Sequence, residues 1–373
     1  MKKILIIAGE VSGDLHGGNL VKAMHKLDPS LYFFGIGGEN MKANGVELIY
    51  HINSLSFMGF IEVIKHLPFL RKVKKEILKI STEKNPDAII LIDYPGFNLS
   101  IAKELFKQGR KIFYYISPQI WAWGKSRIDL IRKIIHKMMV VFPFEEKMYR
   151  EAGVNVEFVG HPLLDVIENY SYESREKFFS SNGLSLDKKL LAIFPGSRKQ
   201  EIKKILPEIY KAVKKLRDEF DLNVAISGIK SIDIDIYKEI VGEEMPIIFD
   251  RNYELMKYAY AGIIKSGTST LEAALLELPF VVVYKTSYLS YLIGKNLIKI
   301  DRISLANIVA GEKIVKELIQ NDCNADHIYM EIKNIINNEN LRNELVDKLR
   351  NIKNSLGKIG ASERAANLIL REI

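Results

Sequence analysis

Two glycine-containing turns carry the residues of this chain that are best suited to bind an anion. The first, at 9–14, follows the apolar run 3–8, and the second, at 195–198, follows the apolar run 189–194. A strand that turns through glycine into a helix leaves the first amides of that helix unpaired, and such amides attract anions. Because the arrangement occurs once in each half, we predict two similar α/β lobes that face each other across a cleft and bind phosphorylated molecules.

The second turn has the side chains expected around a diphosphate. Gly196 lets the backbone approach closely, Ser197 offers a hydroxyl, and Arg198 supplies a fixed charge with paired donors. An Arg and a helix N-terminus that already point at a departing phosphate stabilise its growing charge without a metal. The alternative is a helix start with an exposed Arg.

A hydroxyl-rich turn later in the chain repeats this pattern. It consists of Ser266, Gly267, Thr268, Ser269 and Thr270. At a helix N-terminus it predicts a second anion site, and Glu272, one turn further on, is suited to accept hydrogen bonds from ribose hydroxyls. A capping box is the alternative for the hydroxyls, and it does not exclude ligand binding.

A carboxylate ends one apolar run of the first half. Asp93 follows residues 89–92, and Pro95 with Gly96 makes a rigid turn directly after it. Open α/β sheets bind ligands at the carboxyl ends of their strands, so Asp93 is suited to act as the general base for an attacking hydroxyl. An Asp that only caps the turn is the alternative. His16 is the second catalytic candidate.

The elements that must position these residues alternate along both halves. Strands are predicted at 3–8, 31–36, 88–92, 111–116, 138–142 and 156–159, and then at 189–194, 223–227, 247–249, 261–264 and 280–284. Helices are predicted at 17–26, 70–84, 102–108, 204–220, 270–276 and 361–371. Strand and helix in alternation indicate parallel, doubly wound sheets. A Gly- and Pro-containing segment at 160–165, followed by a charged helix-like stretch at 172–179, marks the lobe boundary.

Composition indicates a globular protein of two domains. The 373 residues are 47% apolar and 27% charged, with one cysteine and a formal net charge of +8. This excess of basic residues attracts phosphates, anionic lipid or nucleic acid without choosing among them. The apolar run that ends before Glu10 is too short for a secretory signal, and no run approaches the ~20 residues that span a bilayer. We therefore expect a cytoplasmic protein with at most peripheral membrane contact.

Six motifs in one order along the chain resemble those of the lipid A disaccharide synthase family. They are AGEVSGD (8–14), IDYPGFN (92–98), SPQIWAW (117–123), PGSR (195–198), KSGTSTLE (265–272) and GASERAA (360–366). The resemblance covers essentially the whole chain. It implies a GT-B glycosyltransferase that moves 2,3-diacylglucosamine from UDP to the 6-hydroxyl of 2,3-diacylglucosamine 1-phosphate. The β-1,6 lipid A disaccharide and UDP would be the products, formed with inversion and without a cofactor or metal.

The resemblance gives roles to residues of both halves. It places the key aspartate at Asp93, and the first turn would approach the acceptor sugar. The polar side chains of that turn are Glu10, which is also a catalytic candidate, Ser12, Asp14 and His16. The alternative is that Ser12 and Asp14 cap their own helix. On the donor side, Asn307 and Gln320 lie in a block similar to the donor loop of the family, but Glu312 stands where relatives commonly carry Arg. A phosphate role there would need Lys313 instead.

The acyl chains of both substrates require apolar surface, and the segment 57–80 is the candidate. Its apolar residues alternate with basic ones, which is the composition of a helix in an anionic interface, where each basic residue adds about 1 kcal/mol. The residues expected to contact acceptor or membrane are Met58, Phe60, Ile61, Ile64, Phe69, Leu70, Arg71 and Lys72. A buried core helix with a basic outer face is the alternative. Residues 288–299 are a weaker candidate.

Both tryptophans, Trp121 and Trp123, lie just after a predicted strand and before several basic residues. Aromatic and basic residues together stack on a sugar or a base, and we expect acceptor contact and packing between lobes. Nucleic-acid binding is the competing interpretation, but no RNP-like or helix-turn-helix pattern supports it. The pair Asp233 and Asp235 resembles a metal-binding D-x-D, yet it lies in a loop-like stretch away from any phosphate-binding turn.

We therefore expect three parts: an acceptor-binding and membrane-facing lobe at 1–165, a UDP-sugar-binding lobe at 166–356, and a C-terminal helix at 357–373 that returns to the first lobe. The expected partners are UDP-diacylglucosamine, diacylglucosamine 1-phosphate and the inner membrane of a Gram-negative-type bacterium. A UDP-sugar epimerase has the same architecture but no use for the apolar segment at 57–73. A non-catalytic sensor of sugar nucleotides would keep Arg198 and Glu272 but have no need of Asp93. The sequence does not predict the oligomeric state.

Overall fold

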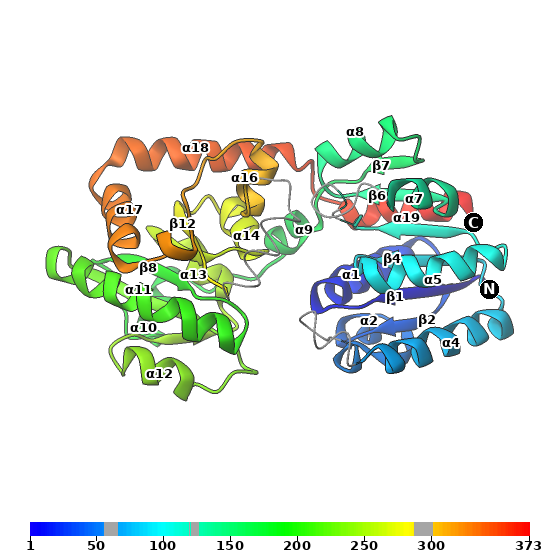
Figure 1. Cartoon of the computed structure of the whole chain (residues 1–373), viewed down its shortest axis with the longest axis horizontal. Helices are drawn as coiled ribbons and strands as arrows, with labels where there is room; N and C mark the ends of the chain where they lie inside the picture. The colour runs from blue at the N-terminus through cyan, green and yellow to red at the C-terminus, as the bar shows by residue number, and fades with distance from the viewer. Residues whose placement is uncertain (56–65, 119, 121–126, 287–300) are drawn as a thin grey trace. The chain divides into compact units, whose positions relative to one another are not determined.

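The computed structural model describes residues 1–55, 66–118, 120, 127–286 and 301–373 (Figure 1). It divides into two compact units, one made of Met1–Asp165 with Leu356–Ile373 and the other of Val166–Ser355. Each unit contains one parallel sheet with alternating helices. The predicted fold class, two doubly wound Rossmann-like lobes, is confirmed.

The first lobe contains a seven-stranded sheet in the order β3-β2-β1-β4-β5-β6-β7. Its strands are β1 (Lys3–Ala8), β2 (Tyr32–Gly37), β3 (Val46–His51), β4 (Ala88–Ile92), β5 (Ile112–Tyr115), β6 (Lys137–Val140) and β7 (Val156–Phe158). The chain builds outward from β1 to β3 and then returns to the other side of β1 with β4. This reversal lies between β1 and β4.

Helices cover both faces of this sheet. They are α1 (Val11–Leu27), α2 (Glu39–Ala43), α4 (Leu67–Lys84), α5 (Pro95–Lys107), α7 (Ile128–Ile134), α8 (Pro143–Glu151) and α19 (Ala361–Glu372), and α9 (Pro162–Glu168) spans the boundary between the units. Leu5 and Ile7 of β1 share a core cluster with residues of α4, α5 and α7. Successive strand residues point to opposite faces, so Ile4 and Ile6 face the other layer. All four are completely buried.

The C-terminal helix α19 belongs to the first lobe and packs against α1 (Figure 1). Ala361, Ala365 and Ile369 on its inner face are completely buried. At its end, Lys2 Nζ donates to the carbonyl oxygen of Ile373 over 2.7 Å, so the two termini of the chain lie together. The first lobe is therefore completed by the last residues of the sequence.

The second lobe contains a six-stranded sheet in the order β10-β9-β8-β11-β12-β13. Its strands are β8 (Lys189–Phe194), β9 (Leu222–Gly228), β10 (Ile247–Phe249), β11 (Ala261–Lys265), β12 (Phe280–Tyr284) and β13 (Glu317–Ile319). Its helices are α10 (Arg175–Ser181), α11 (Lys199–Glu219), α12 (Asp235–Val241), α13 (Asn252–Tyr258), α14 (Ser269–Leu275), α16 (Leu305–Ala310), α17 (Ala325–Asn337) and α18 (Glu339–Ser355). Here the direction of strand addition reverses between β8 and β11.

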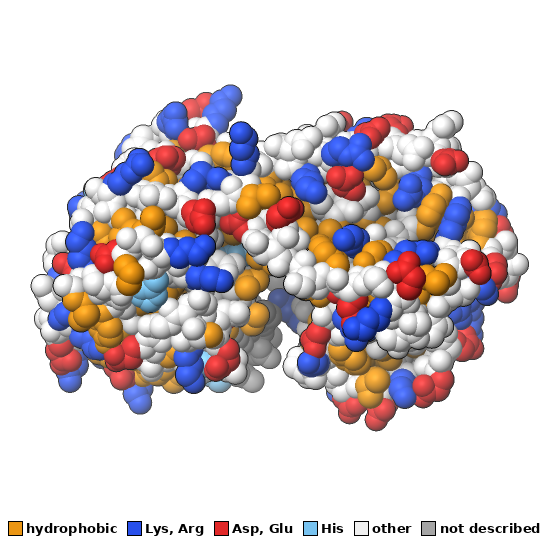
Figure 2. Space-filling view, turned by 180° about the vertical axis from the view of Figure 1, so that it is seen from behind, with side chains coloured by type: hydrophobic (Ala, Val, Ile, Leu, Met, Phe, Trp, Pro, Cys, Tyr) orange, Lys and Arg blue, Asp and Glu red, His pale blue; other side chains and the backbone are white. Residues whose placement is uncertain are grey.

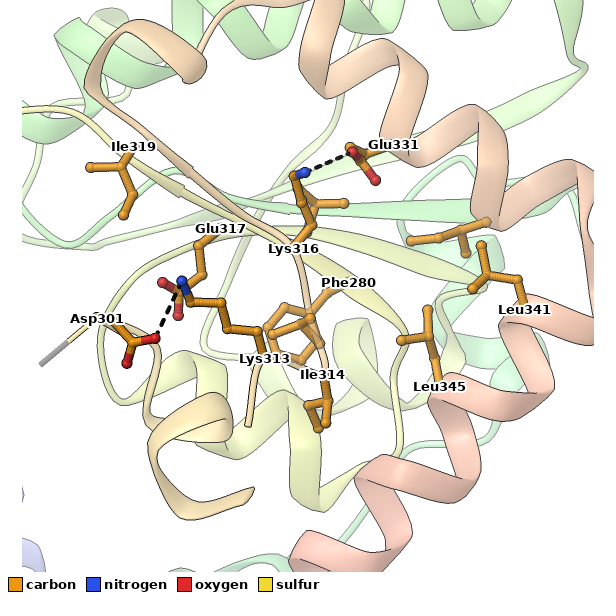
Figure 3. A pocket seen from close by; sticks show the side chains of 13 residues that line it. Phe280, Asp301, Lys313, Ile314, Lys316, Glu317, Ile319, Glu331, Leu341 and Leu345 are labelled. Carbon is orange, nitrogen blue, oxygen red and sulfur yellow. Dashed lines mark ion pairs between the residues drawn. The ribbon is translucent and has the colours of Figure 1, made fainter. Parts of the chain in front are cut away.

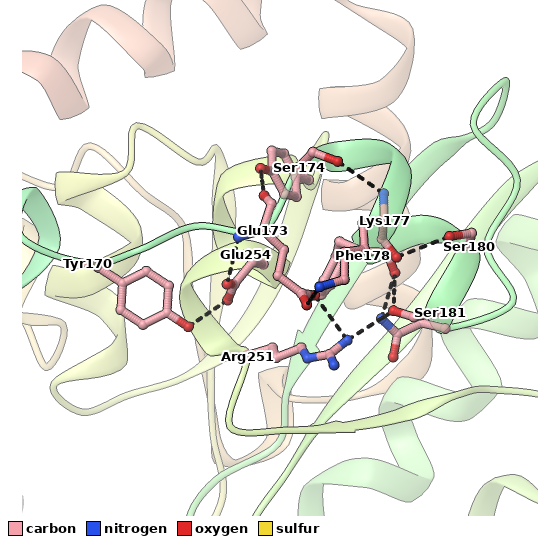
Figure 4. Close-up of polar contacts among 11 residues, drawn as sticks. Tyr170, Glu173, Ser174, Lys177, Phe178, Ser180, Ser181, Arg251 and Glu254 are labelled. Carbon is pink, nitrogen blue, oxygen red and sulfur yellow. Dashed lines mark hydrogen bonds and ion pairs between the residues drawn. The ribbon is translucent and has the colours of Figure 1, made fainter.

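A polar network ties the segment after the lobe boundary to the second lobe (Figure 4). The Tyr170 hydroxyl donates to Glu254 over 2.8 Å, and Arg251 pairs with Glu173 at 3.2 Å. Arg251 also donates to the Ser181 hydroxyl over 2.9 Å. Glu254 is buried, and the hydrogen bonds that its carboxylate accepts from the Tyr170 hydroxyl and, at 3.4 Å, from the Glu173 amide compensate part of the cost of removing its charge from water. Residues from 170 onward are thus anchored on α10 and α13.

The strands β3 and β13 were missed in the sequence. Both lie at sheet edges, where β3 has only one buried residue and β13 has three residues in all, so neither shows an extended apolar run. The helices α1, α5 and α11 begin several residues earlier than predicted. The starts of α1 and α11 directly follow the turn residues Glu10 and Arg198, and α5 begins at Pro95, a residue favoured at the first helical position.

The surface in Figure 2 shows Lys and Arg side chains interspersed with Asp and Glu side chains, not gathered into one basic patch on that face. The basic side chains are therefore spread over this face of the molecule. Within the ranges given above, the structure has no helix that is both long and apolar enough to cross a membrane.

Candidate functional site

Each sheet presents a pair of turns where its strand order reverses. In the first lobe, the residues after β1 and β4 lie at this point, and these include Glu10 and Asp93. In the second lobe the turns after β8 and β11 lie there, and these contain Gly196 and Ser266. Open parallel sheets bind ligands at the carboxyl ends of the strands at such reversals. The topology thus brings predicted site residues together within each lobe.

The turn after β4 holds Asp93 in a strained conformation. Asp93 and Tyr94 have φ angles of 44° and 47°, in the left-handed region that residues with a side chain seldom adopt. The carbonyl oxygen of Asp93 accepts hydrogen bonds from the Asn98 amide at 2.7 Å and from the Tyr114 hydroxyl at 2.5 Å. Asn98 is completely buried and also donates to the Ile92 carbonyl. These bonds hold the strained turn in one geometry.

Burial and a neighbouring carboxylate change the acidity of Asp93. Burial raises its pKa, the negative charge of Glu10 raises it further, and the result is about 7. A general base works best when its pKa is close to the working pH. Asp93 is therefore suited to accept a proton from a hydroxyl near neutral pH.

The two turns of the first lobe also fit together sterically. A Cβ atom at Gly9 would lie 2.1 Å from Cδ1 of the Tyr94 ring, so only glycine allows this ring to lie against the first turn. The Tyr94 hydroxyl donates to the carbonyl oxygen of Leu55 over 3.1 Å. Gly9 is thus required for packing beside Asp93.

His16, the second candidate base, is buried in α1. Burial lowers its pKa to about 4, and the pKa of the neighbouring His161 falls to about 3 through burial and the influence of His16. The Nδ1 atom of His16 has no hydrogen-bond partner among the residues that the structure places. A ring with so low a pKa is a weaker base at neutral pH than the Asp93 carboxylate.

The Asp14 side chain binds another part of its own lobe. Its carboxylate accepts hydrogen bonds from the amides of Gly38, Asn40 and Met41 at 2.6 to 3.0 Å, and from the Asn40 side chain at 2.8 Å. These groups form the start of α2. The alternative that Ser12 and Asp14 cap their own helix is wrong, because α1 has Glu10 at its N-cap and no side-chain cap. A role of Ser12 and Asp14 in acceptor binding stays a prediction.

An apolar cavity of about 400 Å³ lies between α4 and α5, directly beside the strained turn. The residues that line it are Leu67, Leu70, Arg71, Lys74, Tyr94, Gly96, Phe97 and Ser100. Lys74 donates to the Ser100 hydroxyl over 2.9 Å, and Arg71 is exposed. The cavity therefore combines apolar walls with two cations.

The helix α4 also contributes to the core. Val73 and Ile77 are completely buried, and Phe69 packs against the same cluster, with its ring 6.3 Å from that of Tyr50. Lys72 is exposed. The predicted contacts Met58, Phe60, Ile61, Ile64, Trp121 and Trp123, and the segment 288–299, lie outside the described residues. The described part of the apolar segment is thus a core helix with a basic outer face, one end of which borders the cavity.

In the second lobe, the turn after β8 is built around glycine and a carboxylate. Gly196 has a φ angle of 121°, and a Cβ atom there would lie 2.6 Å from Oε2 of Glu201. That oxygen accepts a hydrogen bond from the Ser197 amide at 3.1 Å. Arg198 is the N-cap of α11, its side chain is 54% exposed, and it lies 3.6 Å from Glu201. Arg198 is therefore accessible to an anion.

The hydroxyl-rich turn after β11 is held by its own side chains. Ser266 donates to the carbonyl oxygen of Ile303 over 2.8 Å, and Thr270 donates to that of Gly267 over 2.7 Å. Thr268, the N-cap of α14, makes no side-chain cap bond, so a capping box does not explain this motif. The hydroxyls of Ser266 and Thr270 thus shape the turn, and their contact with a donor stays a prediction.

Glu272 is held beside an aromatic cluster. The Tyr253 hydroxyl donates to its carboxylate over 3.1 Å, and burial raises the pKa of Glu272. The ring of Tyr253 in turn lies 4.9 Å from that of Tyr170, edge to face. A carboxylate oriented in this way is suited to accept a hydrogen bond from a ligand hydroxyl.

Asn307 and Gln320 both bind neighbouring parts of their own lobe. The buried Asn307 amide donates to Val315 and Glu317 and accepts from the backbone of Ile314 and Val315, at 2.8 to 3.0 Å. Gln320 accepts a hydrogen bond from the Thr286 amide at 2.7 Å. Their side chains organise the loops around β13, and direct contact with a donor stays a prediction.

A further cavity of about 410 Å³ in the second lobe contains none of the predicted site residues (Figure 3). It lies beside β12, β13 and α18, with Phe280, Ile314 and Leu345 among its walls. Lys313, considered above as a substitute for the missing Arg, lines this cavity and pairs with Asp301 at 3.5 Å. Its present partner is therefore a carboxylate.

The D-x-D pattern forms a helix start. Asp233 accepts a hydrogen bond from the Asp235 amide at 3.1 Å, directly before α12. Among the residues whose placement the structure gives, no group of three or more His, Cys, Asp or Glu side chains is arranged to hold a metal ion.

The two lobes define a class of protein. The fold matches a solved S. aureus structure described as an MnaA-UDP complex, with a TM-score of 0.71 at 17% identity, covering 100% of this chain and 98% of that one. It also matches CalG4, the calicheamicin glycosyltransferase, with a TM-score of 0.62 at 14% identity and coverage of 100% and 98%. The fold is that of GT-B glycosyltransferases and related epimerases.

The sequence gives the family. A family model described as lipid-A-disaccharide synthetase matches residues 4–371, and the chain belongs to this family. The lipid-A-disaccharide synthase of Geobacter metallireducens is 41% identical, and that of Syntrophus aciditrophicus is 42% identical. Each alignment covers 99% of this chain and 97% of the relative. The resemblance found in the motifs is confirmed, and the chain is a glycosyltransferase.

Proposed function

We propose that this enzyme transfers 2,3-diacylglucosamine from UDP to the 6-hydroxyl of 2,3-diacylglucosamine 1-phosphate. The products are the β-1,6-linked lipid A disaccharide and UDP, and the anomeric centre is inverted. The observation that carries the proposal is the family match over residues 4–371. We assign the acceptor to the first lobe and the donor to the second.

Asp93 is the proposed general base. Its carboxylate takes the proton of the acceptor 6-hydroxyl as the oxygen attacks the anomeric carbon, and the bond from that carbon to the diphosphate breaks. The pKa of about 7 supports this role, because the group is sufficiently ionised at neutral pH and still basic enough to accept the proton. Asn98 and Tyr114 act through the backbone of Asp93 and are positioning residues.

Arg198 and the first amides of α11 are the proposed site for the diphosphate of the donor. Negative charge grows on the leaving diphosphate as the glycosidic bond breaks, and an exposed guanidinium beside a helix N-terminus stabilises it. Glu272 is the proposed acceptor of a hydrogen bond from the ribose. The solved structure described as an MnaA-UDP complex has the same fold, which supports a nucleotide site in this architecture.

The cavity between α4 and α5 is the proposed site for part of the lipid acceptor. Its apolar walls suit an acyl chain, and Arg71 and Lys74 at the same cavity suit a phosphate or an anionic membrane surface. Tyr94, the residue after the proposed base, also lines this cavity, which supports an acceptor site here. We propose that the enzyme works at the inner membrane as a peripheral protein.

The test is an assay with both lipid substrates in the presence of EDTA. UDP release is expected only when UDP-diacylglucosamine and diacylglucosamine 1-phosphate are supplied together, with disaccharide formed in equal amount. Turnover of the UDP-sugar alone would favour an epimerase or hydrolase instead. A solved UDP-N-acetylglucosamine 2-epimerase from Neisseria meningitidis shares the fold, with a TM-score of 0.69 at 12% identity, but a shared fold at this identity does not carry the epimerase reaction to this chain.

A further inference from the structure

A lysine and a glutamate meet at the strand reversal of the second lobe. Lys265 is the last residue of β11, and its Nζ atom lies 2.8 Å from Oε1 of Glu201, near the start of α11. The two side chains are only 16% and 13% exposed. An ion pair with so little exposure costs free energy to form, because both charges lose contact with water. Its location at the sheet edge where ligands bind in such folds suggests that the pair has a role in ligand binding.

The same carboxylate occupies the turn after β8. Its second oxygen accepts the Ser197 amide hydrogen bond, and Arg198 approaches its first oxygen at 3.6 Å. The positive φ of Gly196 and the absence of a Cβ atom leave room for it. Glu201 thus contacts two cations and accepts a hydrogen bond from one amide at the place where a diphosphate is proposed to bind, and its single negative charge leaves the site with an excess positive charge.

We propose that Lys265 is a second cation for the donor diphosphate, and that Glu201 is its partner only while the site is empty. This inference rests on the proposed function, which assigns the donor to the second lobe. When the nucleotide binds, Lys265 and Arg198 turn from the single carboxylate to the phosphate oxygens. Lys265 has a negatively charged partner both in the empty site and in the nucleotide-bound site. Its burial therefore does not incur the free-energy cost of an isolated buried charge.

The competing explanation is a structural ion pair. In that case Lys265 serves only to neutralise Glu201, and removal of Glu201 would make Lys265 irrelevant to the ligand. The two explanations differ in what Lys265→Gln does when Glu201 is already Gln. A double-mutant cycle therefore separates them.

The experiment measures the affinity for UDP and for uridine by calorimetry, with the full-length protein at low salt. The variants are Lys265→Gln, Glu201→Gln and the double variant. The matched control is Lys215→Gln, since Lys215 lies at the other end of α11 and pairs with Asp326. Thermal unfolding of each variant identifies any loss of folding.

Lys265→Gln is expected to weaken UDP binding by about tenfold or more while changing uridine binding by less than about twofold, because only the phosphates are contacted. Glu201→Gln is expected to strengthen UDP binding several-fold, because a competing negative charge is removed. The double variant is expected to bind UDP at least about fivefold more weakly than Glu201→Gln, and Lys215→Gln should resemble the wild type.

Equal UDP affinity of the double variant and Glu201→Gln would overturn the inference, with UDP binding itself intact. Equal losses for UDP and uridine would also overturn it. If the wild-type protein does not bind UDP at all, the assignment of the donor to the second lobe fails, and this inference fails with it.

Discussion

The role of Asp93 as general base requires that its own carboxyl group loses its proton near neutral pH. The base must be ionised, so the rate is expected to rise about tenfold per pH unit below pH 7 and to level off above it. Asp93→Asn should lower kcat by about a hundredfold to ten-thousandfold. The measurement is UDP release from pH 5 to pH 9.

Glu10→Gln tests the cause of this pH dependence. The charge of Glu10 contributes to the raised pKa of Asp93, so its removal should move the acidic limb to lower pH. An unchanged limb in this variant, or an intact rate in Asp93→Asn, would contradict the assignment of Asp93 as the base.

The same carboxylate is expected to reduce stability at alkaline pH. Its pKa rises from 3.8 to about 7 on folding, so between these values the folded protein keeps a proton that the unfolded chain has lost. The contribution of Asp93 to stability is therefore full below about pH 4 and is lost as the pH rises through 7. Asp93→Asn should be more stable than the wild type at pH 8, and this difference should vanish towards pH 4.

Urea unfolding at pH 8, 6 and 4 measures this effect. Asp187→Asn is the matched control, because that side chain is exposed. A stability difference for Asp93→Asn that does not depend on pH would show that the Asp93 carboxyl does not titrate as described.

At the level of residues, the sequence located Asp93 because its type and its place after an apolar run are both local features. It did not reveal Asn98 or Tyr114, whose role depends on hydrogen bonds to the backbone of Asp93. It also did not single out Glu201, which is brought to Lys265 by the pairing of β8 with β11. Such contacts follow from tertiary structure and have no signal in the spacing of the motifs.

At the level of elements, α4 and the cavity beside it are expected to bind anionic lipid. The double variant Arg71→Gln and Lys74→Gln should weaken binding to vesicles of anionic phospholipid by about thirtyfold, since two basic residues that contribute about 1 kcal/mol each add to about 2 kcal/mol. Vesicle flotation measures the bound fraction.

The charge-matched control for this test is Lys211→Gln with Lys214→Gln on α11. It removes the same charge from exposed positions of the second lobe. Equal loss of vesicle binding in both double variants would indicate an effect of net charge alone, and α4 would not be the membrane contact.

The C-terminal helix α19 is expected to stabilise the first lobe. Ile369→Ala removes a completely buried side chain and should lower the free energy of unfolding by about 2 to 5 kcal/mol. Ile359→Ala is the control, because Ile359 is 52% exposed. Equal small effects of the two substitutions, measured by urea unfolding, would contradict the docking of α19.

Most elements could be predicted from the sequence because central parallel strands are continuous apolar runs, as in β1, β4 and β8. Edge strands such as β3 and β13 lack this signal and depend on pairing with a neighbour. The role of Asp14 was also hidden, because its carboxylate binds the start of α2, a helix that the sequence did not predict.

At the level of the whole molecule, the second lobe is one continuous segment with its own core. The hydrophobic cluster of Leu191 to Leu345 lies entirely within Val166–Ser355. We expect a protein made of residues 166–355 to fold cooperatively and to bind UDP, because the proposed donor contacts are all in this segment. Circular dichroism and calorimetry would test this, and a folded segment without affinity for UDP would place donor contacts in the other lobe.

The first lobe, unlike the second, is not made of one continuous segment. Its helix α19 can pack against α1 only after the whole second lobe has been translated. Domains generally fold as they emerge from the ribosome, but the first lobe lacks one of its packed helices until α19 has been synthesised. A chain that stops early would leave the buried side of α1 uncovered and would be a target for proteolysis. Copies that lack α19 are therefore expected to be degraded faster than the full-length protein.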